Sequence, residues 1–435
     1  MNINYSNNPY HRLPSGPANT SGIVANLPEA TRSGTQNIYR LMSVASRSPS
    51  EAIIDAAKQA LEDRVSGNKS LWKTLKDGPH KGRTLVEASV ILKLPELTEE
   101  ILRLSKGSTR KHLEEYTVLG QAAVRKDHNM VKSLLAANAN PDEKGWNGCS
   151  ALHQAARDNN PDLVKILMYE GKGADPSLKN NFGQVPIYLA AATRSTDALR
   201  ALLEDEAGRT TMNEKSNKGM TPLLAACENG DLASVKALLE KGCETEWRNK
   251  FEQTALARSV DLTRSVLVGA LIEAGANTDV SNKDKMPLIA LSILRSKSNT
   301  ILRQLLDAGA DPSQRCSYRT ELSLYNGMSI LDLAALWNDA ELITELVKKY
   351  GFNVNDALAS EGKSYSKSGA IRLAKNLPPL YFACLIGGKK AIRTLVDLGA
   401  NIDLLDVYRF SFSYETRELL GMLKYPNKRL GTNKG

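Results

Sequence analysis

The stretch GMTPLLAACENGDLASVKALLEKG, residues 219–242, decides the fold of this chain. Thr221 can cap a helix through its hydroxyl, and Pro222 suits the first helical position, where its missing N–H costs nothing. The Gly230–Asp231 pair ends that helix and begins a second one, and Gly242 supplies the left-handed residue that ends the second helix. Two helices this short cannot bury their apolar faces alone, so the unit needs copies of itself on either side.

Such copies occur along most of the chain, at successive steps of 33, 33, 35, 36, 33, 32, 43 and 49 residues. Each copy is marked by a residue equivalent to Thr221, which precedes an Ala- and Leu-rich helical stretch. The period of about 33 residues predicts a stack of helix-turn-helix units rather than separate domains. The nine markers are Thr84, Thr117, Ser150, Val185, Thr221, Thr254, Met286, Ser329 and Pro378.

The best copy reads SALHQAA from Ser150 and closes with Gly173–Ala174–Asp175. Together with the endings Gly275–Ala276–Asn277 and Gly309–Ala310–Asp311, it resembles the ankyrin repeat. The resemblance covers residues 82–403. It implies an all-α solenoid of eight to nine stacked repeats with β-hairpin fingers, and a function in protein–protein interaction. In that family Ser150 and His153 tie a helix start to the neighbouring turn, which gives both residues a structural role.

Composition restricts the class of protein further. The five cysteines show no paired metal spacing, so we expect free thiols, no metal and a reducing compartment. No apolar run reaches the length of a membrane span, and we expect a soluble chain with no membrane partner. Residues 1–80, 357–376 and 404–435 each carry a net charge of +3, which accounts for the whole +9. The repeats are therefore neutral, which argues against a nucleic-acid partner.

The first 35 residues are rich in Asn, Ser, Thr, Pro and Gly and have no apolar period. Such a stretch does not bury enough surface to order itself, so we expect a disordered N-terminus. Its composition is similar to the secretion signals of bacterial type III effectors. That likeness implies a virulence effector that is secreted into a host cell and binds a host protein; the alternative location is the cytoplasm of the producing cell.

Four further segments flank or interrupt the array. Residues 36–81 predict a small helical capping segment, and residues 404–435 a C-terminal cap with a basic tail. The long steps place insertions at residues 314–326 and 357–376, on surface loops of the solenoid.

The fingers between repeats carry the candidate binding residues. Aromatic rings beside Lys and Arg at solvated loop tips are typical of the anchors of protein interfaces. The alternative is that each ring folds back onto a neighbouring finger. The predicted partner-binding residues are Trp146, Phe182, Trp247, Arg248, Lys250 and Phe251, together with Tyr318 in the first insertion.

No catalytic motif, cofactor site or small-molecule substrate site is recognisable, so the sequence predicts a non-catalytic scaffold. Two alternatives of other classes remain open. Residues 94–104, which begin Leu-Pro-Glu-Leu, resemble the opening of an F-box and would make the chain an adaptor for a ubiquitin ligase. Otherwise the same residues form the second helix of a degenerate first repeat. The second alternative is an enzyme whose site lies within residues 1–110.

Overall fold

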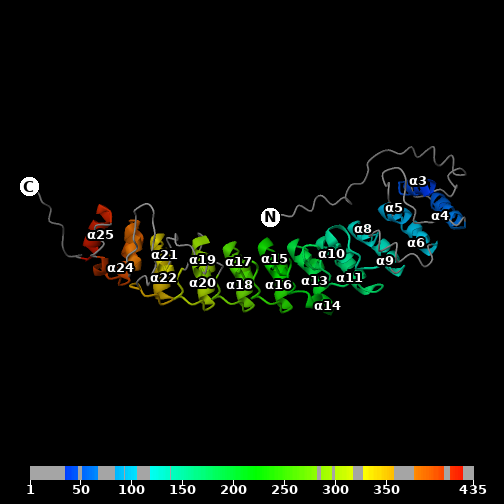
Figure 1. Cartoon of the computed structure of the whole chain (residues 1–435). Coiled ribbons are helices and arrows are strands. Elements are labelled where there is room, and N and C mark those ends of the chain that lie inside the picture. Colours follow the sequence, from blue (N-terminus) through cyan, green and yellow to red (C-terminus); the bar gives the residue numbers. More distant parts are fainter. Residues whose placement is uncertain are drawn as a thin grey trace, which may run out of the picture. The chain divides into compact units, whose positions relative to one another are not determined.

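The computed structural model describes residues 35–47, 51–66, 84–92, 94–104, 118–137, 139–281, 286–295, 299–316, 327–356, 377–405 and 412–424. The chain divides into two compact units, Met1–Cys243 and Glu244–Gly435, and each is described by itself. Both consist of pairs of short helices (Figure 1). In each pair, the inter-helix turn joins the first helix to the second helix, and a finger is the loop that joins one pair to the next.

The described residues of the first unit form two longer helices followed by five pairs. The longer helices are α3 (Thr35–Ala45) and α4 (Glu51–Ser66). The pairs are α5 (Leu85–Ile91) with α6 (Pro95–Leu104), α8 (Val118–Val124) with α9 (His128–Ala136), α10 (Ala151–Arg157) with α11 (Pro161–Tyr169), α12 (Pro186–Ala192) with α13 (Thr196–Glu204), and α15 (Pro222–Asn229) with α16 (Leu232–Glu240). A one-turn helix, α14 (Glu206–Thr210), follows α13 and accounts for the step of 36 residues.

The described residues of the second unit form four pairs followed by one further helix. The pairs are α17 (Ala255–Asp261) with α18 (Ser265–Glu273), α19 (Leu288–Arg295) with α20 (Thr300–Asp307), α21 (Ile330–Leu336) with α22 (Ala340–Lys348), and α23 (Pro379–Leu385) with α24 (Lys389–Asp397), and the further helix is α25 (Tyr414–Lys424). Within each unit, first helices pack on first helices of the next pair. The predicted all-α solenoid is confirmed.

The markers precede the helices as predicted. Thr221 is the N-cap of α15, where its hydroxyl accepts a hydrogen bond from the Leu224 N–H at 3.3 Å. Gly242 has a φ of 79°, the left-handed conformation expected after α16. Met286 stands two residues before α19, and Thr117 lies outside the described residues. The other markers are N-caps of their first helices: Thr84, Ser150, Val185, Thr254, Ser329 and Pro378.

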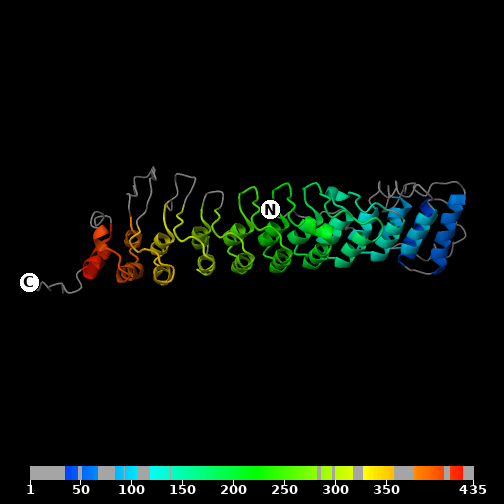
Figure 2. The same ribbon diagram turned by 90° about the horizontal axis from the view of Figure 1, so that it is seen from below.

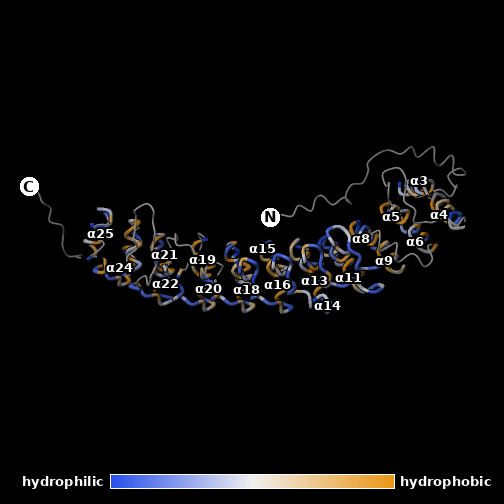
Figure 3. The backbone as a smooth tube through the Cα atoms, in the orientation of Figure 1, coloured by the Kyte–Doolittle hydropathy of each residue, from blue (hydrophilic) through white to orange (hydrophobic). Residues whose placement is uncertain are grey.

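Apolar side chains fill the layers between the helices, and polar side chains cover the outer ends (Figure 3). Ala, Leu, Val and Ile supply most of the buried surface, and Phe382 is the largest fully buried side chain among the described residues. Thin layers of small residues allow neighbouring pairs to approach closely, which is why an array low in aromatic residues is stable.

The predicted capping segment and the F-box-like segment pack together. The α3 and α4 helices contact each other and the first pair, α5 and α6. On α6, Leu97 and Ile101 are fully buried against α4, α5 and α9, as expected for the second helix of a degenerate repeat. Residues 67–81 of the predicted capping segment lie outside the described residues, as do residues 1–34, most of the two insertions and the basic tail.

The fingers leave the helices on one side of each unit (Figure 2). The described residues contain no β-strand, and the one bridge among them joins Ser281 and Pro287. The fingers that contain Phe182 and Phe251 are tight turns in place of the predicted hairpins, because the side chains of Asn180 and Asn249 accept hydrogen bonds from the backbone of these loops.

Candidate protein-binding surface

In the first unit, the finger around Phe182 shows how such a turn is built. Asn180 Oδ1 accepts hydrogen bonds from the Phe182 N–H at 2.9 Å and the Gln184 N–H at 3.0 Å. The Asn180 N–H donates to the Gln184 carbonyl at 3.0 Å and so closes the loop. Gly183, with a φ of 71°, supplies the left-handed step. The side chain of one residue thus holds the ring-bearing tip in a single conformation.

Consecutive fingers of this unit are bonded to one another. The Asn181 N–H donates to the Asn147 carbonyl at 2.9 Å, and the Asn217 N–H donates to the Phe182 carbonyl at 2.9 Å. A Cβ on Gly183 would lie 2.8 Å from the Asn217 backbone nitrogen, which real Cβ atoms do not tolerate. The glycine is therefore required both for its φ and for the approach of the next finger.

Among the described residues of the second unit, one finger carries two exposed aromatic rings. Trp247 is 36% exposed and Phe251 is 65% exposed. Asn249 Oδ1 accepts hydrogen bonds from the Phe251 N–H at 2.8 Å and the Gln253 N–H at 3.0 Å, which repeats the closure of the Phe182 finger. Glu252 takes the place of the glycine, with a φ of 58°.

Arg248 has a structural use in addition to its exposure. Its guanidinium Nη1 donates to the Glu252 carbonyl at 3.3 Å and to the Ser281 carbonyl at 3.4 Å. It therefore braces its own finger and contacts the next one, which leaves Lys250 as the exposed cation at the tip. Sequence reasoning missed this bracing, because no local pattern identifies the partners of an arginine.

The structure places the predicted binding residues in two groups. Trp146 and Phe182 are half-buried on neighbouring fingers of the first unit. Trp247, Arg248, Lys250 and Phe251 share one exposed finger of the second unit. Tyr318 lies outside the described residues.

His153 pins a helix start to the next finger, as the resemblance implied. Its Nδ1 accepts a hydrogen bond from the Ser150 N–H at 3.1 Å, and its Nε2 donates to the Gln184 carbonyl at 2.9 Å. Burial lowers the pKa of His153 to about 4, so the ring is neutral at pH 7. A neutral ring with both nitrogens bonded is a structural group and not a general base.

Asp332 stands at the position of His153 in a repeat of the second unit, three residues after the N-cap Ser329. It places an acidic side chain where the first unit has an imidazole. The carboxylate is fully buried, and its Oδ2 accepts hydrogen bonds from the Ser329 N–H at 2.7 Å and the Ser329 hydroxyl at 2.9 Å. Its Oδ1 has no hydrogen-bond partner, and Arg315 Nη1 lies 4.0 Å from Oδ2. Burial raises the pKa of Asp332 to about 7, despite the hydrogen bonds from Ser329 and the charge of Arg315.

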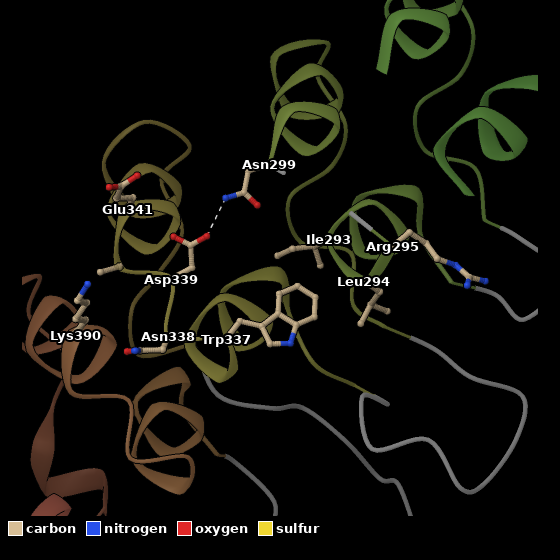
Figure 4. A pocket seen from close by; sticks show the side chains of 10 residues that line it. Ile293, Leu294, Arg295, Asn299, Trp337, Asn338, Asp339, Glu341 and Lys390 are labelled. Atoms are coloured by element: carbon tan, nitrogen blue, oxygen red, sulfur yellow. Dashed lines mark hydrogen bonds between the residues drawn. The ribbon is translucent and has the colours of Figure 1, made fainter. Parts of the chain in front are cut away.

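Sequence reasoning also missed an open groove of about 810 Å³ in the second unit (Figure 4). It is lined by residues of the inter-helix turns, with Trp337, 42% exposed, at its centre. In the sequence, Trp337 ends the apolar run LDLAALW and reads as a core residue, so nothing in the linear pattern marked it as exposed.

Metal ligands, cysteines and the apolar character of the helices are the other features that bear on function in the described part of the chain. No group of three or more His, Cys, Asp or Glu side chains there is arranged to hold a metal ion. The five cysteines, all within the described residues, form no disulfide, and burial raises the pKa of Cys243, Cys316 and Cys384 to about 12. None of the described helices combines the length and the apolar character that crossing a bilayer requires.

Comparison with known proteins identifies the repeats. The family described as "Ankyrin repeats (3 copies)" matches residues 88–180 and 152–249. The human transient receptor potential cation channel subfamily A member 1 is 28% identical over 190 residues, which cover 35% of this chain and 17% of the channel. The mouse B-cell lymphoma 3 protein homolog is 28% identical over 189 residues, or 42% of this chain and 41% of the relative. The chain thus spans less than half the length of either relative.

The solved ankyrin repeat domain of Bcl-3 is a structural neighbour. It is 21% identical, and the superposition covers 52% of this chain and 99% of that domain with a TM-score of 0.47.

Proposed function

We propose that this chain, which carries ankyrin repeats and folds as an all-α solenoid of them, binds a protein partner through its fingers. Ankyrin repeats indicate a scaffold for protein–protein interaction and are generally non-catalytic. We assign the contact to the exposed finger of the second unit, with Trp247, Lys250 and Phe251 as anchors and Arg248 as both brace and contact.

The observation that carries this proposal is an exposed aromatic pair on a finger that its own hydrogen bonds hold in place. Asn249 fixes the Phe251 backbone and Arg248 ties the finger to Ser281. A preorganised loop loses little conformational entropy on binding. Burying a ring such as Phe251 contributes about 2 kcal/mol, so the two aromatic side chains together supply a large part of a specific interaction.

The half-buried rings of the first unit form a second part of the proposed surface. Trp146 and Phe182 sit on fingers joined by the Asn181-to-Asn147 hydrogen bond. Because these rings are partly packed already, they gain less area from a partner than Phe251 does. We expect Trp146 and Phe182 to contribute more to shape complementarity than to affinity. We include Tyr318 of the first insertion as a further proposed contact.

The test uses the full-length chain as bait for proteins of a eukaryotic cell lysate, compared with the double variant Trp247→Ala/Phe251→Ala. Once a captured protein is purified, we expect its affinity to fall at least about tenfold in the double variant. Tyr414→Ala on α25 is the matched control, since Tyr414 is 72% exposed but far along the chain from the finger. If the captured protein binds the double variant and the wild type with equal affinity, this finger is not where the partner binds.

We propose further that the partner is a host protein and that the chain is a bacterial effector delivered by a type III-like route. Its support is the Asn- and Ser-rich composition of residues 1–35. The test fuses those residues to a reporter enzyme in bacteria with and without a working type III apparatus. Reporter activity inside host cells that depends on the apparatus is expected. A reporter that stays in the bacterium would instead assign the chain to the cytoplasm of its own cell.

The F-box-like adaptor is disfavoured by packing. Leu97 and Ile101, the apolar face of that segment, are fully buried in the stack. To present them to a ligase, α6 would have to leave its contacts with α4, α5 and α9.

A further inference from the structure

The position eight residues after each marker falls at the end of the first helix or in the inter-helix turn. In the last three pairs of the first unit this position is polar, and in two of them its side chain is bonded to the preceding turn. The Thr193 hydroxyl lies 3.2 Å from the Arg157 carbonyl, and Asn229 Nδ2 donates to the Ala192 carbonyl at 2.6 Å. These turns satisfy their polar groups within the unit. The residues at this position in the first unit are Leu92, Arg125, Asp158, Thr193 and Asn229, of which the last three are the polar ones in its most regular pairs.

In the second unit the same position is apolar in every pair. We call these four residues the apolar turn row: Leu262, Leu294, Trp337 and Ile386. Trp337 is 42% exposed and Ile386 is 45% exposed, while Leu262 and Leu294 are half-buried. A single exposed apolar residue needs no explanation, but a row at one repeat position on successive turns is typical of an interaction surface.

The two middle members of this row line the groove of the second unit (Figure 4). Leu294 and Trp337 face it, and its polar walls are fixed. Asn299 Nδ2 donates to Asp339 Oδ2 at 2.9 Å, and Asp339 Oδ1 accepts the Leu342 N–H at 3.0 Å. Asn338 Oδ1 reaches across to cap α24, where it accepts the Ala391 N–H at 2.9 Å. The groove is therefore a formed feature with an apolar centre and rigid polar sides.

Cations stand at both ends of the groove. Figure 4 shows Arg295 and Lys390 on opposite sides of Trp337. Arg295 shares the carboxylate of Asp261 with Arg258, at 2.9 and 3.1 Å, so two guanidinium groups meet one negative charge. Lys390 is exposed on the first turn of α24.

The groove also contains two carboxylates, Asp339 and Glu341, which offset the positive charge of Arg295 and Lys390 to different degrees. The charge of Asp339 is engaged at the N-terminus of α22, where it complements the helix dipole. Glu341 is exposed beside it and is the carboxylate that would oppose an acidic ligand. The N-terminus of α20 adds positive potential, since its N-cap Asn299 makes no side-chain cap bond.

From this arrangement we infer that the groove binds an acidic protein segment, with a large apolar side chain against Trp337 and carboxylates toward Arg295 and Lys390. This site is separate from the proposed finger surface. A finger leads into a first helix and an inter-helix turn leaves it, so the two surfaces occupy opposite ends of these helices. The second unit therefore has room for two partners at once.

The experiment selects random 12-residue peptides displayed on phage against the full-length chain, followed by removal of those that also bind Trp337→Ser. We expect the surviving peptides to combine Leu, Phe or Trp with flanking Asp or Glu. For a synthetic peptide from that pool, Trp337→Ser should weaken binding at least about tenfold and Lys390→Glu about fivefold. Glu341→Gln should strengthen it about twofold.

Two controls isolate the site. Arg393→Glu changes the same charge on the same helix α24 outside the groove lining and should leave affinity within about twofold. Trp247→Ala/Phe251→Ala should leave peptide binding unchanged, which separates this inference from the finger proposal. Basic or purely polar peptides in the surviving pool, or a pool left empty by the removal of Trp337→Ser binders, would overturn the inference. So would a dimer in sedimentation that Trp337→Ser abolishes, because a second copy would then be the occupant.

Discussion

Replacing Asp332 by Asn tests the electrostatics of the second unit most directly. The carboxyl is fully buried, with a pKa raised to about 7. Between the ordinary Asp pKa, near 4, and pH 7, the folded chain holds a proton on Asp332 that the unfolded chain has lost. Stability therefore falls as pH rises through this window, by about 1.4 kcal/mol per pH unit.

The magnitude follows from the interval measured. From pH 5 to pH 8, the wild type loses about 3 kcal/mol through this group, because the loss ends near pH 7. Asp332→Asn keeps the side-chain shape and an oxygen for the Ser329 N–H, and it does not titrate. The stability of the variant relative to wild type should thus be about 3 kcal/mol more favourable at pH 8 than at pH 5.

Urea denaturation at both pH values provides the measurement. Trp fluorescence follows the unfolding; Trp337, immediately after α21, contributes to it together with Trp72, Trp146 and Trp247. Glu341→Gln is the control, since it removes an exposed carboxylate from the same pair and should show no such pH difference. A relative stability that is equal at the two pH values, or less favourable at pH 8, would mean that Arg315 keeps Asp332 ionised and would refute the reasoning.

Three further predictions concern other positions. Burial holds the pKa of His153 near 4, so the unfolded chain binds the extra proton between about pH 4 and 6.5; stability should rise with pH there, by about 3 kcal/mol in total, and urea titrations of His153→Gln should lack that rise. Gly183→Ala should cost about 3 kcal/mol in urea denaturation, because its Cβ meets Asn217, whereas Gly242→Ala, with open space around it, should cost only about 1 kcal/mol. Glu252→Gly relieves a φ of 58° and should raise thermal stability by up to about 1 kcal/mol; a loss would show that the side chain matters more than the backbone.

Much of the fold was predictable because each repeat carries its own start and stop signals. Thr221, Gly230 and Gly242 act through local backbone geometry, which sequence alone determines. The structural role of Ser150 and His153 followed from the ankyrin resemblance. The finger closures were not predicted, because the Asn180 and Asn249 side chains replace a strand ladder, and the linear pattern of a hairpin and of such a turn is the same.

The candidate site was predictable only where exposure follows from chain position. Trp247 and Phe251 were identified because fingers are solvated in any such stack. Trp337 was not, because its neighbours in sequence are core residues and its exposure depends on the turns of adjacent pairs. Seen one repeat at a time, Leu294, Trp337 and Ile386 are the ends of three apolar helices.

Aligning the repeats changes what those residues mean. In the first unit, Thr193 and Asn229 at the same position bond the neighbouring turn, so a polar residue there stabilises the stack. The second unit gives up those bonds and exposes a tryptophan instead, which stabilises the isolated chain less. An apolar residue at this position in four consecutive pairs makes the isolated chain less stable. Such a row is expected where a bound partner buries the exposed apolar side chains. The difference between the two units is therefore itself a reason to look for a partner at the turns as well as at the fingers.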